Sequence, residues 1–175
     1  VGDFGNPGRV NTTKVLSKMG FAFSGLESRP WDTITINNTK IGFCSFSPNR
    51  GTVKITDIEN AKKIVEKLNA FTDIIVVSFH GGAEGSSKTH VTKQTEYFYG
   101  ENRGNVHKFS HAVVDAGADI VFGHGPHVTR TIELYKNRLI CYSLGNFCTY
   151  GRFSLKGLKG IGPMVEVKIK NDGSF

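Results

Sequence analysis

The sequence has few cysteines and no long apolar run. Its three cysteines, Cys44, Cys141 and Cys148, are an odd number, and none belongs to a CxxC pair. These two facts argue against a complete disulfide framework and against a thiolate zinc site. Cys44 and Cys141 lie inside apolar runs, where we expect small buried thiols. No apolar stretch approaches the roughly 18 to 20 residues that span a membrane.

Several well-known catalytic and nucleotide-binding motifs are also missing. The sequence contains no GxSxG nucleophile elbow, no GxxxxGK[ST] phosphate-binding loop and no GxGxxG fingerprint after a strand. No cysteine lies in a turn of the kind that activates a thiolate. These absences argue against a nucleophilic triad, a P-loop enzyme and a dinucleotide-binding enzyme.

The charge balance is basic, with 22 Lys and Arg against 15 Asp and Glu and a formal net charge of +7. Such a balance can attract nucleic acid, an anionic membrane surface or an acidic substrate. The basic residues are scattered, since the longest uninterrupted cluster is Lys62-Lys63. We therefore expect no nucleic-acid partner, and favour a phosphate ester or another polyanion.

The 175 residues fit one domain, residues 1–175, by length and composition. Buried strands that alternate with helices predict α/β layers, and hairpins predict a mixed sheet or two sheets. In chain order, we expect a loop at 1–8, a helix at 11–19, strands at 21–24, 33–37 and 40–47, an amphipathic helix that begins at residue 56 or 57, a fully buried strand at 73–79, an irregular loop at 85–99, a helix at 105–116, a strand at 118–122, a hairpin of 130–135 and 138–144, and a strand at 163–169.

Histidines follow the two most apolar of these strands, in the glycine-rich segments SFHGGAEG and GHGPH. Ligands gather at the carboxyl ends of strands in α/β sheets, and neutral imidazole commonly binds zinc, manganese or iron. Glycine weakens the packing of a strand and proline ends its ladder, so we expect these residues to shape a ligand-bearing loop. His80, His124 and His127 are therefore candidate metal ligands, with structural hydrogen bonding as the alternative. The other histidines, His90, His107 and His111, are expected at the surface.

Longer segments around these histidines resemble a known family. DIIVVSFHGGAEG and VVDAGADIVFGHGPHVTRTIELYKNRLICYSLGNF resemble the CapA-type poly-gamma-glutamate (capsule) synthesis proteins, of the calcineurin-like metallophosphoesterase superfamily. DFGNPG and KMGFAFSG resemble the stretch after the Asn-Asn-His motif of that family, so the resemblance runs from Val1 to about Lys170. It implies an α/β fold of the four-layer α/β/β/α sandwich type, of which this chain would be a C-terminal portion with mixed sheets.

The resemblance also implies a two-metal site with Mn, Zn or Fe. His80 and His124 would bind one ion and His127 the other, and Asp3 matches an acidic residue after the Asn-Asn-His motif. The superfamily's early aspartate motifs, its bridging aspartate and its Asn-His pair do not occur here, so a general acid would lie upstream of Val1. The chain also carries Gly125 where many relatives have histidine, and Gly81 where a bulky aromatic is usual.

Three further residues match positions near the family's site: Glu84, Arg130 and Asn146. The resemblance implies that they contact substrate or orient ligands, and an arginine fork suits a phosphate or carboxylate oxygen.

Three hypotheses of function remain open. The first is a metal-dependent hydrolase of the phosphoesterase type in capsule synthesis. The second is a non-catalytic component that binds an anionic polyglutamate chain alongside other capsule-synthesis proteins, and an amide hydrolase of that chain lies between the two. The third is a metal-free remnant. The resemblance suggests a membrane-anchored or extracytoplasmic protein, with any anchor upstream.

Overall fold

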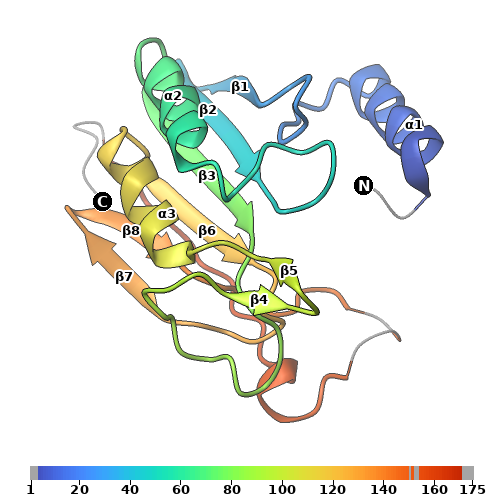
Figure 1. The fold of residues 1–175 in the computed structure, drawn as a ribbon. Helices are drawn as coiled ribbons and strands as arrows, with labels where there is room; N and C mark the ends of the chain where they lie inside the picture. The colour runs from blue at the N-terminus through green and yellow to red at the C-terminus, as the bar shows by residue number, and fades with distance from the viewer. Residues whose placement is uncertain (1–3, 150, 152–153, 171–175) are drawn as a thin grey trace.

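A mixed six-stranded sheet forms the centre of the protein, in the order β1-β2-β3-β6-β8-β7 (Figure 1). The structure, a computed structural model, describes residues 4–149, 151 and 154–170. The sheet strands are β1 (Trp31–Ile36), β2 (Thr39–Phe46), β3 (Ile74–His80), β6 (Ile120–His124), β7 (Ile132–Tyr135) and β8 (Arg138–Cys141). The other elements are α1 (Gly5–Lys18), α2 (Ile58–Asn69), β4 (Tyr97–Phe98), β5 (Glu101–Asn102), α3 (Val106–Asp115) and η1 (Gly157–Gly160).

The sheet combines parallel and antiparallel pairs. β2, β3, β6 and β8 run parallel to one another, while β1 and β7 pair antiparallel at the two edges. Both edge hairpins turn through two residues of positive φ, Asn37-Asn38 and Lys136-Asn137. Such turns match the twist of the paired strands. The predicted α/β class, the mixed sheet and both hairpins are therefore confirmed.

Two helices, α2 and α3, cover one face of the sheet (Figure 1). Asp57 caps α2 and Asn105 caps α3, since each side chain accepts a backbone N–H in the first turn. The ring of Phe109, on α3, packs edge-on against Phe46 and Phe79 at centroid distances of 5.2 and 5.6 Å. The buried side chains of the helices and the sheet form one hydrophobic cluster.

The opposite face of the sheet is only half-buried in the described residues. Along β3, buried Ile75, Val77 and Phe79 alternate with partly exposed neighbours. The prediction of a strand buried on both faces is therefore wrong, because helices lie on one side only. One helical layer and one sheet account for two of the four layers that the resemblance implies.

Three local predictions are also wrong. α1 begins at Gly5, within the expected loop, because Pro7 is tolerated in the first turn of a helix. Residues 21–24 form no strand: the side chain of Asp32 accepts the N–H of Phe23 at 3.0 Å, in place of a ladder partner. Residues 163–169 alternate in exposure but pair with no other strand among the described residues.

Candidate strand-end site

His80 and His124 lie side by side at the carboxyl ends of two parallel strands. They are matched Cα partners in the pairing of β3 with β6. The next residue, Gly81, continues the contact by donating its N–H to the carbonyl of His124 at 2.9 Å. The two histidine loops that the sequence singled out therefore meet at one edge of the sheet.

The glycines of these loops also have a packing role. A Cβ on Gly123 would clash with the ring of Phe79 and would lie 2.6 Å from the carbonyl oxygen of Tyr142. Gly125 has φ +126°, and a Cβ there would lie 2.7 Å from the carbonyl oxygen of Gly81. Close approach of backbones and a positive φ both require glycine. Packing therefore requires these glycines, in addition to the loop-shaping role expected from the sequence.

A chain of polar contacts joins four of the predicted residues through one that the sequence did not reveal, Arg103. Its Nη2 donates to His80 Nε2 at 2.7 Å and to Glu84 Oε1 at 3.0 Å. The other oxygen of Glu84 lies 3.6 Å from His127 Nε2. His127 Nδ1 in turn contacts Asn146 Oδ1 at 2.6 Å. The path His80–Arg103–Glu84–His127–Asn146 is continuous, and we call it the polar chain.

The contact with Arg103 defines the protonation state of His80. A guanidinium can only donate, so Nε2 of His80 must accept and the ring is neutral with its proton on Nδ1. Burial lowers the pKa of His80 from 6.5 to about 4, with further lowering by the charges of Arg103, His127 and His124. A neutral imidazole is the form that binds metal ions.

Asn146 sets the orientation of His127. Its Nδ2 donates to the carbonyls of His127 and Lys159, at 3.2 and 3.1 Å, so its Oδ1 is left to accept the Nδ1 proton of His127. Nε2 of His127 then faces the carboxylate of Glu84. Either a proton on Nε2 of His127 or a cation between this nitrogen and Oε2 of Glu84 would make the contact at 3.6 Å attractive.

A wide groove of about 1080 Å³ opens at the strand ends. His80 and His124 line it together with Arg9 and Arg50, several serine and asparagine side chains, and no aspartate or glutamate among its described residues. A smaller hollow of about 250 Å³ lies beside Glu84, His127 and Asn146. Histidines, arginines and hydroxyl groups without a carboxylate suit an anionic ligand in the groove.

The three histidines predicted as metal ligands lie at two positions in the site. His80 and His124 are neighbours on the sheet, and His127 faces Glu84. In the part of the chain that the structure describes, the three histidines do not bring their ligand atoms within 4.8 Å of one another. The donor types fit divalent ions that take imidazole and carboxylate, with two protein ligands at each position. Asp3, the fourth predicted ligand, lies outside the described residues.

Arg130 does not point into the groove. Its side chain has no exposed surface and pairs with Glu96, from Nη1 to Oε1 at 2.9 Å and from Nη2 to Oε2 at 2.8 Å. It also donates to the carbonyls of Lys88 and Ala83. Glu96 completes the arrangement by accepting the N–H of Ala83 at 2.9 Å. This buried ion pair fixes the loop after β3.

The other three histidines differ in their surroundings. His90 is exposed, as expected. His107 and His111 are partly buried, contrary to the expectation of surface residues, because α3 packs them beside the edge strand β7. His111 Nε2 lies 3.1 Å from both oxygens of Glu133. No sequence pattern links His111 with Glu133, 22 residues apart.

Comparison with known families agrees with the resemblance. The family model described as bacterial capsule synthesis protein PGA_cap matches residues 1–150. The chain belongs to the PGA_cap family. The matched range includes the polar chain, both histidine loops and the whole sheet.

Two relatives of this chain are CapA proteins from Bacillus. The chain is 37% identical over 106 residues to capsule biosynthesis protein CapA of Bacillus anthracis, covering 61% of this chain and 21% of that protein. It is 30% identical over 115 residues to PGA biosynthesis protein CapA of Bacillus subtilis (strain 168), covering 65% and 27%. The chain therefore spans only a fifth to about a quarter of these relatives.

Among solved structures, the chain is similar to a hypothetical protein from Thermus thermophilus. The TM-score is 0.46 with 15% sequence identity, over 70% of this chain and 41% of that one. Among the described helices, none is long and apolar enough to cross a membrane.

Proposed function

We propose that this chain supplies the strand-end part of a metal-dependent hydrolytic site of the phosphoesterase type, which acts in capsule or polyglutamate synthesis. One observation carries the proposal: neutral His80 and neighbouring His124 lie side by side at the strand ends and line one groove. Both CapA relatives carry capsule or PGA biosynthesis in their names, which supports the biological process.

Two divalent ions, of Mn, Zn or Fe, would bind at the two donor pairs. His80 and His124 would hold one ion, and His127 with Glu84 the other, with Asp3 as a further ligand. Such ions lower the pKa of a bound water and polarise a phosphoryl oxygen. The resemblance implies a general acid and a bridging carboxylate in addition to these donors.

The remaining residues of the site position these donors. Arg103 would hold Glu84 in place after its guanidinium turns away from His80, and Asn146 orients the ring of His127. Nε of Arg103 is a buried donor with no partner among the described residues, which favours an anionic oxygen or a water at this point. Arg130 takes a positioning role in this proposal, because its guanidinium is buried against Glu96. The substrate anion would meet Arg9 and Arg50 in the groove.

The test is hydrolysis of bis(p-nitrophenyl) phosphate by the complete protein with added Mn²⁺ or Zn²⁺. We expect metal-dependent hydrolysis that falls by at least about a hundredfold in a His80→Ala, His124→Ala double variant. His90→Ala is the control, because His90 is exposed and away from the groove. Activity that is absent, or unchanged in the double variant, would overturn the proposal.

A non-catalytic role in binding polyglutamate is the second candidate. The groove's arginines and the net charge of +7 favour it, because carboxylates of a polymer would meet the same surface as a phosphate ester. Binding to poly-gamma-glutamate should weaken steeply with salt and should fall in an Arg9→Gln, Arg50→Gln variant. Binding without hydrolysis would select this candidate, and salt-independent or absent binding would reject it.

A further inference from the structure

Three side chains with metal-ligating atoms meet away from the strand ends, between α3 and the edge strand β7. His107 and His111 lie one helical turn apart on α3, with ring centroids 4.1 Å apart. Glu133 reaches them from β7. One ligand atom from each of the three lies within 4.8 Å of the others, which no other group of three achieves in the described part of the chain. We call these residues the α3–β7 cluster.

The spacing of the α3–β7 cluster is close to that of a metal site. Zinc binds imidazole nitrogen and carboxylate oxygen at about 2.0–2.2 Å, so two ligands of a tetrahedral zinc lie about 3.4 Å apart. The pair His111 Nε2 and Glu133 Oε1, 3.1 Å apart, already meets this limit. A separation at the 4.8 Å limit would need to close by about 1.4 Å, which side-chain rotations of these partly buried residues provide.

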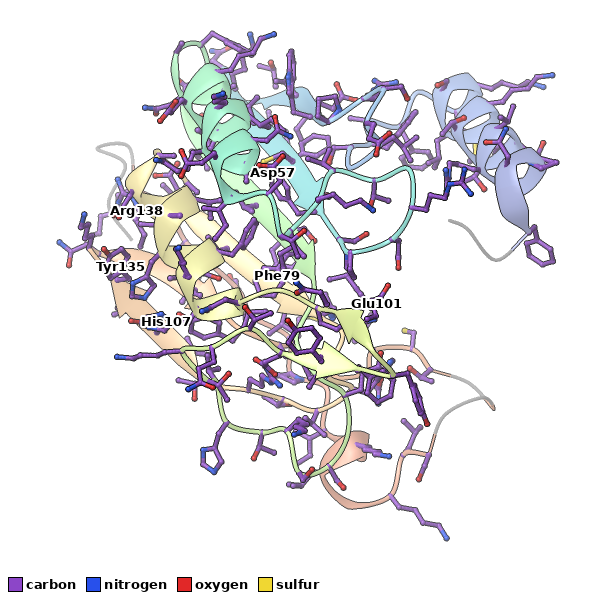
Figure 2. All side chains as sticks on the ribbon, viewed as in Figure 1. Asp57, Phe79, Glu101, His107, Tyr135 and Arg138 are labelled. Atoms are coloured by element: carbon purple, nitrogen blue, oxygen red, sulfur yellow. The ribbon has the colours of Figure 1, made fainter. Side chains whose placement is uncertain are left out.

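Neighbouring tyrosines hold two of the three side chains in place. The hydroxyl of Tyr142, a buried residue, donates to Glu133 Oε2 at 2.6 Å, and the ring of Tyr135 stacks on His111 at 3.8 Å between centroids. Outer partners of this kind orient ligands in metal sites. Figure 2 places His107, on α3, and Tyr135, on β7, at the same edge of the sheet.

The cluster is also accessible to an ion. The side chain of His111 is 22% exposed and that of Glu133 is 31% exposed, so both side chains reach solvent. Two imidazoles and one carboxylate match the ligand types of zinc, and three protein ligands leave a fourth position for water.

We propose that His107, His111 and Glu133 bind one divalent transition-metal ion, with zinc as the expected ion, which links α3 to the edge strand β7. This site is separate from the strand-end donors and does not depend on the proposed hydrolytic function. A metal ion held by two histidines of α3 and by Glu133 of β7 would stabilise the folded state increasingly as the free metal concentration rises above its Kd.

The experiment is a titration of the chelator-treated 175-residue chain with Co²⁺, followed by NMR and by visible absorption. We expect Co²⁺ to broaden the ring resonances of His111 and of Tyr135, which stacks on it. This local signal distinguishes the cluster from the strand-end histidines. Added Zn²⁺ should compete and restore the resonances.

Matched variants separate metal binding from a simple hydrogen bond. His107→Gln leaves the contact of His111 with Glu133 in place, yet should weaken Co²⁺ binding at this site at least about tenfold. Glu133→Gln keeps an acceptor for Tyr142 and should also weaken Co²⁺ binding at this site. His124→Gln and His90→Gln should leave the response of the Tyr135 resonance to Co²⁺ unchanged. If Tyr135 does not respond to Co²⁺, or if His107→Gln binds as tightly as the parent chain, the cluster is a hydrogen-bonded pair and the proposal fails.

Discussion

Arg103 donates a hydrogen bond across 2.7 Å to Nε2 of His80, the ring nitrogen through which this histidine would bind a metal ion. The Arg103 guanidinium therefore occupies the position that a metal ion bound to His80 would need. Metal binding at His80 requires the guanidinium to turn toward its other partners, Glu84 and Glu101, with which it already forms ion pairs at 3.0 and 2.8 Å. Arg103 thus couples metal binding at His80 to the ion pair that it forms with Glu84.

Replacing Arg103 should raise the pKa of His80. Burial is the main cause of the low value of about 4, and the charge of Arg103 is the second. Arg103→Met removes the positive charge but not the burial, so the pKa should move upward without reaching its ordinary value near 6.5. NMR titration of the His80 ring measures this change. Arg138→Met, which alters an arginine paired with Asp119, is the control, and an unchanged His80 midpoint would contradict the prediction.

The low pKa of His80 also predicts how stability depends on pH. The folded-state pKa of about 4 lies below the ordinary value of 6.5, so the unfolded chain takes up a proton that the folded chain does not. This contribution is fully present above about pH 6.5 and is lost as the pH falls toward 4. His80→Gln, which keeps an acceptor for Arg103, should therefore lose less stability between pH 7 and pH 4.5 than the parent chain.

Urea unfolding in the presence of a chelator, at the two pH values, tests this prediction. His90→Gln is the matched control, because His90 is exposed. Equal losses in His80→Gln and in the parent chain would show that His80 does not titrate as described.

Breaking the buried pair of Arg130 and Glu96 should destabilise the fold strongly. Arg130→Met leaves the Glu96 carboxylate buried without its cation, which costs about 3–5 kcal/mol in the free energy of unfolding. Lys62→Met, which breaks the exposed pair with Glu59, should cost less than about 1 kcal/mol. Chemical denaturation of both variants gives the comparison. The double variant Arg130→Met, Glu96→Leu should be less destabilised than Arg130→Met, and the opposite order would refute this account.

Gly123 should tolerate no side chain. In Gly123→Ala the new methyl group meets the ring of Phe79 and the carbonyl of Tyr142, so we expect a loss of about 1–3 kcal/mol or more. Gly42→Ala, on β2 of the same sheet, is the control, because its nearest contact is Leu68 Cδ2, the end of a flexible side chain, at 2.9 Å. Thermal unfolding should show the larger drop for Gly123→Ala, and equal drops would count against a specific role of Gly123.

The sequence by itself determined the local elements that place the site. The spacing of apolar residues predicted α2 and α3, the short apolar runs predicted β3 and β6, and the Asn37-Asn38 and Lys136-Asn137 turns predicted both hairpins. These signals are local, since each depends on residues within one turn or one strand. They were enough to bring His80 and His124 to the same edge of the sheet, because parallel strands end together.

Only the tertiary structure decided which side chains complete the site. Arg103 meets His80 from 23 residues away, Glu96 meets Arg130 from 34, and Glu133 meets His111 from 22. The loop that carries Glu96 and Arg103 has no periodic pattern, so its path depends on packing rather than on propensity. Packing also decided that Gly123 is a contact point for Phe79 as well as a link in the histidine loop. Contacts between distant segments leave no trace in local spacing, and in this protein they form both the polar chain at the strand ends and the separate α3–β7 cluster.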